Sequence, residues 1–276
     1  MLSLMNYKQS MAYWCLADTE WNWDTEQICR AAVELGLSGL ELPPPDSYPT
    51  LEKYKLQSSL CVNGMPGVPF VKGLNNLSYH EEIISRTKDS IDRASGYGFP
   101  NVIAFTGYKW RDAEDPASGE ISLQHCATNC VKGLSELSAY AAEKNVTVCL
   151  EHLNSRVSSH PMKGHPGYQG DDLDVCADIV RTVNSPNVRL LFDVYHVQVM
   201  HGDIITRLNA NRDVIGHIHT AGCPGRNELD NSQEINYAAI VNAIKEIGYS
   251  RYIGHEFIPT RDPMDGLNAA VALFNG

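Results

Sequence analysis

Four side chains that could bind a metal ion follow short apolar segments in the second half of this chain. They are Glu151 after VTVCL, Asp193 after VRLLF, His219 in IGHIHTA and Glu256 in YIGHEF. Carboxylates held close together repel one another and lose hydration, and a divalent cation removes that cost. Oxygen ligands with one imidazole nitrogen suit Mn²⁺ or Mg²⁺, and Co²⁺ or Zn²⁺ are also compatible. The residue types therefore predict one divalent metal site.

Strand alternation predicts that these groups point to a common interior. Thr147, Cys149 and Glu151 share one face of a strand whose other face is aliphatic. Taken alone, a glutamate at a strand end is more simply explained by solvation or a salt bridge. His217, two residues before His219, is better explained as a hydrogen-bonded interior histidine than as a ligand. Four such groups on successive strand ends favour a metal centre over coincidence.

Two more side chains stand within reach of these strand ends. His196 follows Asp193 by three residues, and Arg226 lies on the turn AGCPGR after His219. A guanidinium can bind a carboxylate or paired hydroxyl groups through two hydrogen bonds. Both residues are candidates for substrate contact, although either could be an ordinary loop residue.

Short apolar runs alternate with helical patterns along the whole chain. The expected strands are residues 10–16, 39–43, 58–64, 101–107, 146–153, 188–195, 215–221 and 252–258. Clear helical patterns cover residues 24–36, 80–98, 123–145 and 237–249. Eight strand–helix units predict an α/β fold with a parallel sheet, closed into a single-domain (β/α)₈ TIM barrel over residues 1–276. An open doubly wound sheet is less consistent, because no glycine-rich phosphate loop follows the first strand.

Residues 154–170 form a long connection without periodicity after the fifth predicted strand. Active sites of such barrels are built from loops at the carboxyl ends of the strands. We therefore expect this loop to act as a lid, the alternative being a tolerated surface insertion.

Composition narrows the classes of partner. Acidic residues number 33 and basic residues 22, giving a formal net charge of -11, and no lysine or arginine cluster occurs. This charge disfavours nucleic-acid binding and favours a small-molecule substrate. Eight scattered cysteines include no CxxC pair, and no apolar run has the length of a signal peptide or a membrane span. We expect a cytoplasmic protein that does not bind membranes.

The second half of the chain resembles the xylose isomerase-like TIM barrel superfamily, especially its hydroxypyruvate isomerase-like branch. The matching segments are EHLN (151–154), HPGYQ (165–169), LLFDVYHVQ (190–198), GHIHTAGCPGR (216–226) with NEL behind it, QEINY (233–237) and GHEF (254–257). The first half of the chain resembles the superfamily only in its alternation of predicted strands and helices. The resemblance implies a homodimer or a homotetramer.

The resemblance also implies roles for individual residues. It implies that Glu151, Asp193, His219 and Glu256 bind the metal, and that Glu151 and Glu256 exchange the substrate proton. It further implies that His196 and Arg226 hold the substrate. From the segment HPGYQ we add His165 as a third substrate-binding residue.

The implied reaction is a metal-dependent isomerisation of a small hydroxy-ketone or hydroxy-aldehyde through a cis-enediolate, stabilised by the ion as a Lewis acid. Substrates would be hydroxypyruvate and tartronate semialdehyde, or a related sugar or sugar acid. The strands carrying Glu151 and Glu256 are expected to face each other across the barrel, so that both carboxylates flank the substrate.

The residues at the site are compatible with more than one class of substrate. Hydroxypyruvate isomerases proper tend to carry Gln where this chain has His219, whereas ketose 3-epimerases carry His. A ketose 3-epimerase, or a keto-sugar or inosose dehydratase or lyase, is therefore a serious alternative. A nuclease for abasic sites lacks its additional histidine and aspartate ligands here, and a non-catalytic sugar-binding barrel would not require both glutamates.

Overall fold

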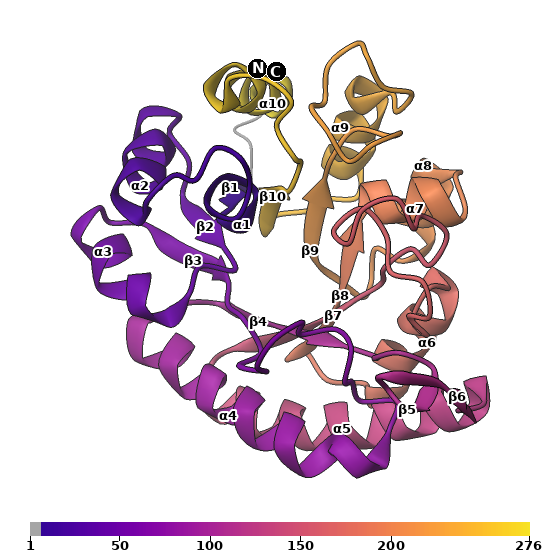
Figure 1. Ribbon diagram of the computed structural model, residues 1–276. Helices are drawn as coiled ribbons and strands as arrows, with labels where there is room; N and C mark the ends of the chain where they lie inside the picture. Colours follow the sequence, from indigo (N-terminus) through magenta and orange to yellow (C-terminus); the bar gives the residue numbers. More distant parts are fainter. Residues whose placement is uncertain (1–6) are drawn as a thin grey trace.

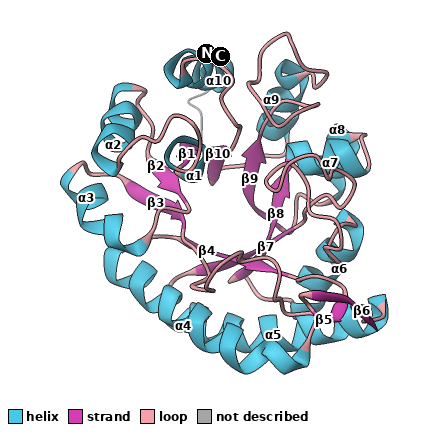
Figure 2. Ribbon diagram, in the orientation of Figure 1, coloured by secondary structure: helices cyan, strands magenta, loops and turns pink. Residues whose placement is uncertain are grey.

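A closed ring of parallel strands, surrounded by helices, forms the centre of the molecule (Figures 1 and 2). The computed structural model describes residues 7–276. The strands of the ring are β1 (Lys8–Ala12), β2 (Gly39–Glu41), β3 (Gln57–Leu60), β4 (Asn101–Phe105), β7 (Thr147–Glu151), β8 (Val188–Asp193), β9 (Ile215–Thr220) and β10 (Tyr252–His255). Their order is β3-β2-β1-β10-β9-β8-β7-β4. The predicted (β/α)₈ barrel is confirmed.

The ring closes through a short bridge between β3 and β4. Cys61, directly after β3, pairs in parallel with Val102. The backbone N–H of Cys61 donates to the Asn101 carbonyl at 2.8 Å, and the Ile103 N–H donates to the Cys61 carbonyl at 3.0 Å. These bonds satisfy backbone groups that an open sheet would leave at its edges.

Helices surround the ring of strands (Figure 2). Most of them cover its outer face, whereas the short helix directly after β1 lies at its mouth. They are α1 (Trp14–Ala17), α2 (Thr25–Glu34), α3 (Tyr48–Lys53), α4 (His80–Tyr97), α5 (Leu123–Glu143), α6 (Leu173–Val183), α7 (Val194–Met200), α8 (Ile204–Ala210), α9 (Tyr237–Glu246) and α10 (Pro263–Asn275). Within the described part of the chain, none of these helices combines the length and the hydropathy that crossing a bilayer requires.

The core has two parts, as the strand alternation predicts. Val146, Val148 and Leu150 belong to the larger cluster that includes buried residues of the surrounding helices. Cys149 belongs to a smaller cluster with Leu191 and other interior side chains. Side chains therefore alternate between the two faces of the strands, and the face of β7 that carries Cys149 is the one on which Glu151 lies.

The expected first strand, residues 10–16, is wrong in its second half. β1 ends at Ala12, and the backbone turns helical at Tyr13 to form α1. The last ladder bond runs from the Tyr13 N–H to the Glu41 carbonyl at 2.9 Å. An apolar run cannot by itself separate a strand from a short buried helix. The turn directs Trp14 toward the mouth of the barrel instead of along its wall.

Two other expectations need correction. The segment 188–195 also divides, because Asp193 ends β8 and caps α7 by accepting the N–H of His196 at 3.0 Å. β7 and β10 are separated by β8 and β9, so the strands of the two glutamates face each other obliquely. A hairpin of β5 (Trp110–Asp112) and β6 (Asp115–Glu120) after β4 was not predicted.

Candidate metal centre

The four predicted ligands converge on one point at the carboxyl ends of β7, β8, β9 and β10. A ligand atom of each residue lies within 4.8 Å of a ligand atom of every other. His219 is central: its Nδ1 atom lies 2.8 Å from Glu256 Oε2, 3.3 Å from Glu151 Oε1 and 4.0 Å from Asp193 Oδ2. All four side chains are buried. The predicted grouping is therefore present in the tertiary structure.

The donor set fits a divalent cation. Glu151 Oε1 and His219 Nδ1 are buried and neither has a partner in good hydrogen-bond geometry. Unpartnered buried polar atoms are costly, and a cation would satisfy both of these. Three carboxylates and one imidazole nitrogen are ligands that Mn²⁺ and Mg²⁺ accept.

The two glutamates have opposite electrostatic environments. Burial raises the pKa of Glu151 to about 7. Burial also acts to raise the pKa of Glu256, but the positive charges of Arg226 and His219 outweigh it and lower this pKa to about 2. One carboxyl can therefore gain and lose a proton near neutral pH, while the other stays ionised.

Arg226 lies directly against this centre. Its Nη2 atom is 2.5 Å from Glu256 Oε2 and 3.3 Å from Asp193 Oδ2, and the side chain is 2% exposed. Its Nη1 atom donates to the Met162 carbonyl at 2.5 Å. The guanidinium carbon lies 5.4 Å from the ring centre of Trp14. The Nε–H has no partner, so one donor of the guanidinium is free.

His165 belongs to the 154–170 loop, and His196 contacts the first residue of that loop, Asn154. The Nδ1 atom of His196 accepts the side-chain amide of Asn154 at 2.7 Å and the Asn154 backbone N–H at 3.1 Å. Its Nε2 atom lies 3.6 Å from Asp193 Oδ2. The ring centres of His165 and His196 are 5.8 Å apart. Burial lowers the pKa of His165 to about 3, so this ring is neutral at pH 7.

A cavity of about 530 Å³ opens onto the centre. Glu151, Glu256, Arg226 and His165 are among its lining residues, whereas Asp193, His196 and His219 are not. Its other walls are largely apolar and come from residues such as Tyr13, Trp14, Leu42, Phe70, Ile103, Phe105 and Leu153. Concave sites with few polar groups are typical of small-molecule binding.

The 154–170 loop forms part of this cavity. Met162 and His165 line the cavity. Hydrogen bonds hold the loop in place: the Asn154 side chain donates to the Lys163 carbonyl at 2.8 Å, and the Tyr195 hydroxyl donates to the same carbonyl at 2.7 Å. The loop therefore covers one side of the candidate site.

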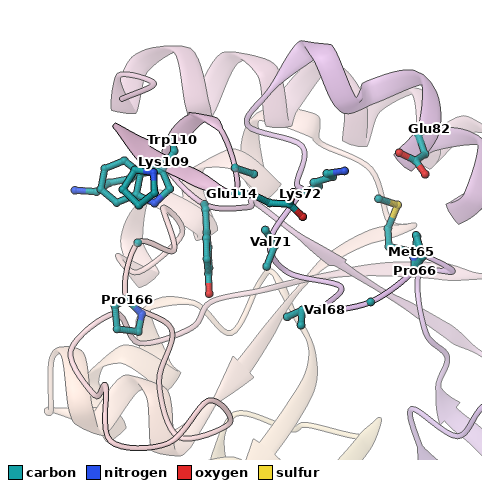
Figure 3. A pocket seen from close by; sticks show the side chains of 15 residues that line it. Met65, Pro66, Val68, Val71, Lys72, Glu82, Lys109, Trp110, Glu114 and Pro166 are labelled. Atoms are coloured by element: carbon teal, nitrogen blue, oxygen red, sulfur yellow. The ribbon is translucent and has the colours of Figure 1, made fainter. Parts of the chain in front are cut away.

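A larger hollow, of about 740 Å³, lies beside this cavity and shares Met65, Gly67 and Val68 with it. Figure 3 shows Trp110 and Lys109 on one side of the hollow, Met65 and Glu82 on the other, and Glu114 between them. None of the four candidate ligands lines it. The candidate metal centre therefore opens into the smaller cavity, and the larger hollow extends the space next to that cavity.

Two residues of the site were missed from the sequence. Glu41, at the end of β2, contacts His219 and His217 in the barrel interior. The Trp14 indole N–H donates to Glu256 Oε1 at 2.8 Å. Strand parity could have indicated Glu41, which ends its strand just as Glu151 does. No comparable signal marked Trp14, because it was assigned to a strand.

The fold and the site together define a (β/α)₈ barrel with a buried carboxylate–histidine centre at the carboxyl-terminal mouth. The family described as the xylose isomerase-like TIM barrel matches residues 29–275. The chain belongs to this family.

Comparison with individual proteins agrees with this assignment. A putative hydroxypyruvate isomerase of Drosophila melanogaster is 36% identical over 102 residues, which are 37% of this chain and 39% of that protein. A 2-oxo-tetronate isomerase of Pectobacterium atrosepticum is 25% identical over 256 residues, covering 87% of this chain and 89% of that protein. Across the first three curated relatives, the chain spans between 39% and 60% of their length.

Among solved structures, AP endonuclease, family 2 from Brucella melitensis superposes with a TM-score of 0.78 and 23% identity. The superposition covers 96% of this chain and 97% of that one. At this identity the likeness supports the barrel fold alone.

Proposed function

We propose that this protein is a divalent-metal-dependent isomerase of a small hydroxy-carbonyl compound. Its substrates would be hydroxypyruvate and tartronate semialdehyde, or a related sugar or sugar acid. One observation carries the proposal: Glu151 and Glu256 both approach His219 Nδ1, at 3.3 and 2.8 Å, at the floor of a cavity. The names of the fly and bacterial relatives support the same class of reaction.

Glu151 is the better candidate for the proton-transferring base. Its carboxyl lines the cavity, and in the protein without an ion burial raises its pKa to about 7, so of the two glutamates it is the one that more readily takes up a proton. Glu256, ionised beside Arg226, would be the second carboxylate of the proposed proton exchange. A bound divalent ion, held by Glu151, Asp193, His219 and Glu256, would supply Lewis-acid polarisation of substrate oxygens.

The remaining predicted residues would orient the substrate. Arg226 has a free Nε–H, and His165 has an unpartnered Nδ1 atom at the cavity wall. His196 directs its unpartnered Nε2 atom toward Asp193. Hydrogen bonds from these groups would hold the carbonyl and hydroxyl oxygens in one geometry, and the 154–170 loop would limit the access of water.

The proposal also covers the binding partners, the oligomeric state, the cellular location and the metal ion. We propose a small-molecule substrate, no nucleic-acid or membrane partner, and assembly as a homodimer or homotetramer. The eight cysteines are all buried and unpaired, which supports a reducing, cytoplasmic location. Mn²⁺ or Mg²⁺ would be the ion, with Co²⁺ or Zn²⁺ as substitutes.

Proton exchange tests the reaction class. The protein is incubated with Mn²⁺ in D₂O and a panel of hydroxypyruvate, tetroses, pentuloses and hexuloses. We expect deuterium at the carbon beside the carbonyl in one substrate, together with its isomer, measured by NMR. No exchange with any member of the panel, from protein that has bound Mn²⁺, would contradict the proposal.

A second candidate is an epimerase, dehydratase or lyase that acts on a larger keto-sugar. A three-carbon acid would fill only a small part of the cavity of about 530 Å³, which adjoins a further hollow. Deuterium incorporation with inversion at one carbon, and no carbonyl shift, would identify an epimerase. Loss of water from the product would identify a dehydratase.

A further inference from the structure

A further buried carboxylate, outside the four candidate ligands, lies deeper in the barrel, on the opposite side of His219. Glu41 is 0% exposed, and its Oε2 atom lies 2.5 Å from His219 Nε2. Both carboxylate oxygens lie 2.9 Å from His217 Nε2. His219 therefore has one ring nitrogen at Glu41 and the other among the candidate metal ligands.

Glu41 is fully supplied with hydrogen-bond donors. Besides the two histidines, Ser59 donates its hydroxyl to Oε1 at 3.0 Å, and Ser10 donates to the same oxygen. Neither carboxylate oxygen of Glu41 is among the unpartnered buried atoms, in contrast to Glu151 Oε1. This surrounding favours a hydrogen-bonded anion at Glu41 over a second metal site, although Glu41, His217 and His219 could geometrically form one.

The barrel also leaves space for this carboxylate. Gly254 on β10 faces it, and a Cβ atom added there would lie 2.3 to 2.4 Å from the carboxyl group of Glu41. A real Cβ atom essentially never lies this close to another heavy atom, so any side chain at position 254 would force Glu41 to shift. The position of Glu41 thus depends on a glycine from another strand.

We infer that Glu41 is the positioning residue for His219. By accepting the Nε2–H, it fixes the tautomer and the orientation of the ring, so that the Nδ1 lone pair points at the metal centre. A carboxylate partner on the far nitrogen also makes the metal-facing nitrogen more basic. This inference rests on the proposed metal site, but it assigns a function to a residue that touches neither the ion nor the substrate.

Metal affinity of the variant Glu41→Gln is the first test. The substitution keeps size and removes the charge. We expect Mn²⁺ binding, measured by calorimetry on the folded protein, to weaken by about 10- to 100-fold. The control Ser59→Ala removes one donor to Glu41 but leaves the contact with His219, and should change the Kd less than about threefold. A Glu41→Gln protein that is less stable to heat but binds Mn²⁺ with unchanged Kd would show a merely structural role and overturn the inference.

A measurement on the unaltered protein avoids the risk that a variant fails to fold. In ¹⁵N-histidine-labelled protein loaded with Zn²⁺, long-range ¹⁵N–¹H spectra distinguish the two tautomers of His219. We expect a proton on Nε2 and the ion at Nδ1. A proton on Nδ1 would overturn the inference.

The number of Mn²⁺ ions bound per chain distinguishes a positioning role of Glu41 from a second metal site. We expect one Mn²⁺ per chain in the unaltered protein. Two ions per chain, of which Glu41→Gln loses one, would replace the inference with a second metal site. No binding by the unaltered protein would refute the proposed function together with the inference, whereas equal binding by Glu41→Gln would refute the inference alone.

Discussion

The Nη2 atom of Arg226 lies 2.5 Å from Oε2 of Glu256, and both side chains are buried. A buried arginine and a buried carboxylate stabilise each other, and removing one partner leaves an uncompensated charge. This pair connects the turn after β9 to the end of β10. It also keeps Glu256 ionised, because it contributes to lowering the pKa of that carboxyl to about 2.

Substitution of Arg226 tests this pair. Arg226→Lys keeps the charge but loses the planar guanidinium with its several N–H donors. Because lysine cannot hold Glu256 and the substrate in the same positions, we expect kcat/KM to fall by about 100-fold. Arg226→Met should destabilise the fold by about 3–5 kcal/mol. Arg207→Lys, at a partly exposed pair with Asp174, is the matched control and should change kcat/KM little. Full activity of Arg226→Lys would contradict a role for the guanidinium fork.

Substitution of Glu151 tests the proton transfer. Glu151→Gln keeps the shape of the side chain but cannot accept a proton, so turnover should fall by at least about 10²- to 10⁴-fold. Circular dichroism should show an unchanged fold. Glu143→Gln, at an exposed position of α5, is the control and should retain activity. Substantial turnover by Glu151→Gln would assign the base to another residue.

Removal of the metal should lower thermal stability. Four buried ligands are gathered at one point, and without an ion their carboxylates repel one another. After chelation, addition of Mn²⁺ at about one hundred times its Kd should stabilise the fold by about 2.7 kcal/mol, seen as a rise of several degrees in Tm. Identical melting curves with and without Mn²⁺ would argue against a metal at this site.

Metal affinity should depend on pH in one direction. In the protein without an ion, burial raises the pKa of Glu151 to about 7, so this carboxyl holds a proton at lower pH. Burial acts to lower the pKa of His219, but Glu256 and Glu41 outweigh it and hold this pKa well above its usual range, so His219 also carries a proton. The ion must displace both protons, and Mn²⁺ affinity should therefore fall with falling pH, by up to about tenfold per pH unit for each proton. Glu256, with its pKa at about 2, adds nothing in this range. Calorimetry between about pH 5.5 and pH 8 checks the slope, and constant affinity would contradict the expectation.

Trp14 is expected to hold Glu256 in place. Its indole N–H donates to Glu256 Oε1 at 2.8 Å, and a hydrogen bond to a charged group contributes about 1.5–3 kcal/mol. Trp14→Phe should therefore reduce kcat/KM by about 10- to 100-fold. Trp21→Phe is the control, because it also loses an indole hydrogen bond, here to the Pro259 carbonyl outside the cavity. Equal effects of the two substitutions would indicate loss of stability only.

The sequence alone was sufficient for the barrel and for the grouping of Glu151, Asp193, His219 and Glu256. Strand alternation and the parallel arrangement place the ends of successive strands at one rim, so a local pattern fixes which side chains meet there. The segment 154–170 was also identified as a loop over the site, because no periodic pattern could place it elsewhere. The barrel and the grouping of the four ligands thus depend on patterns that repeat along the chain, and the loop is recognised by the absence of such a pattern.

Contacts between distant strands were decided by the tertiary structure. Glu41 reaches His219, 178 residues further along the chain, only because closure of the ring brings the side chain of β2 against that of β9, with Gly254 leaving the space between them. Trp14 reaches Glu256 because the backbone leaves the strand conformation at Tyr13. Apolar periodicity predicts which face of a helix or strand is buried. It does not predict which side chain of another strand lies opposite that face. That information appears only when the ring closes and the interior side chains pack against one another.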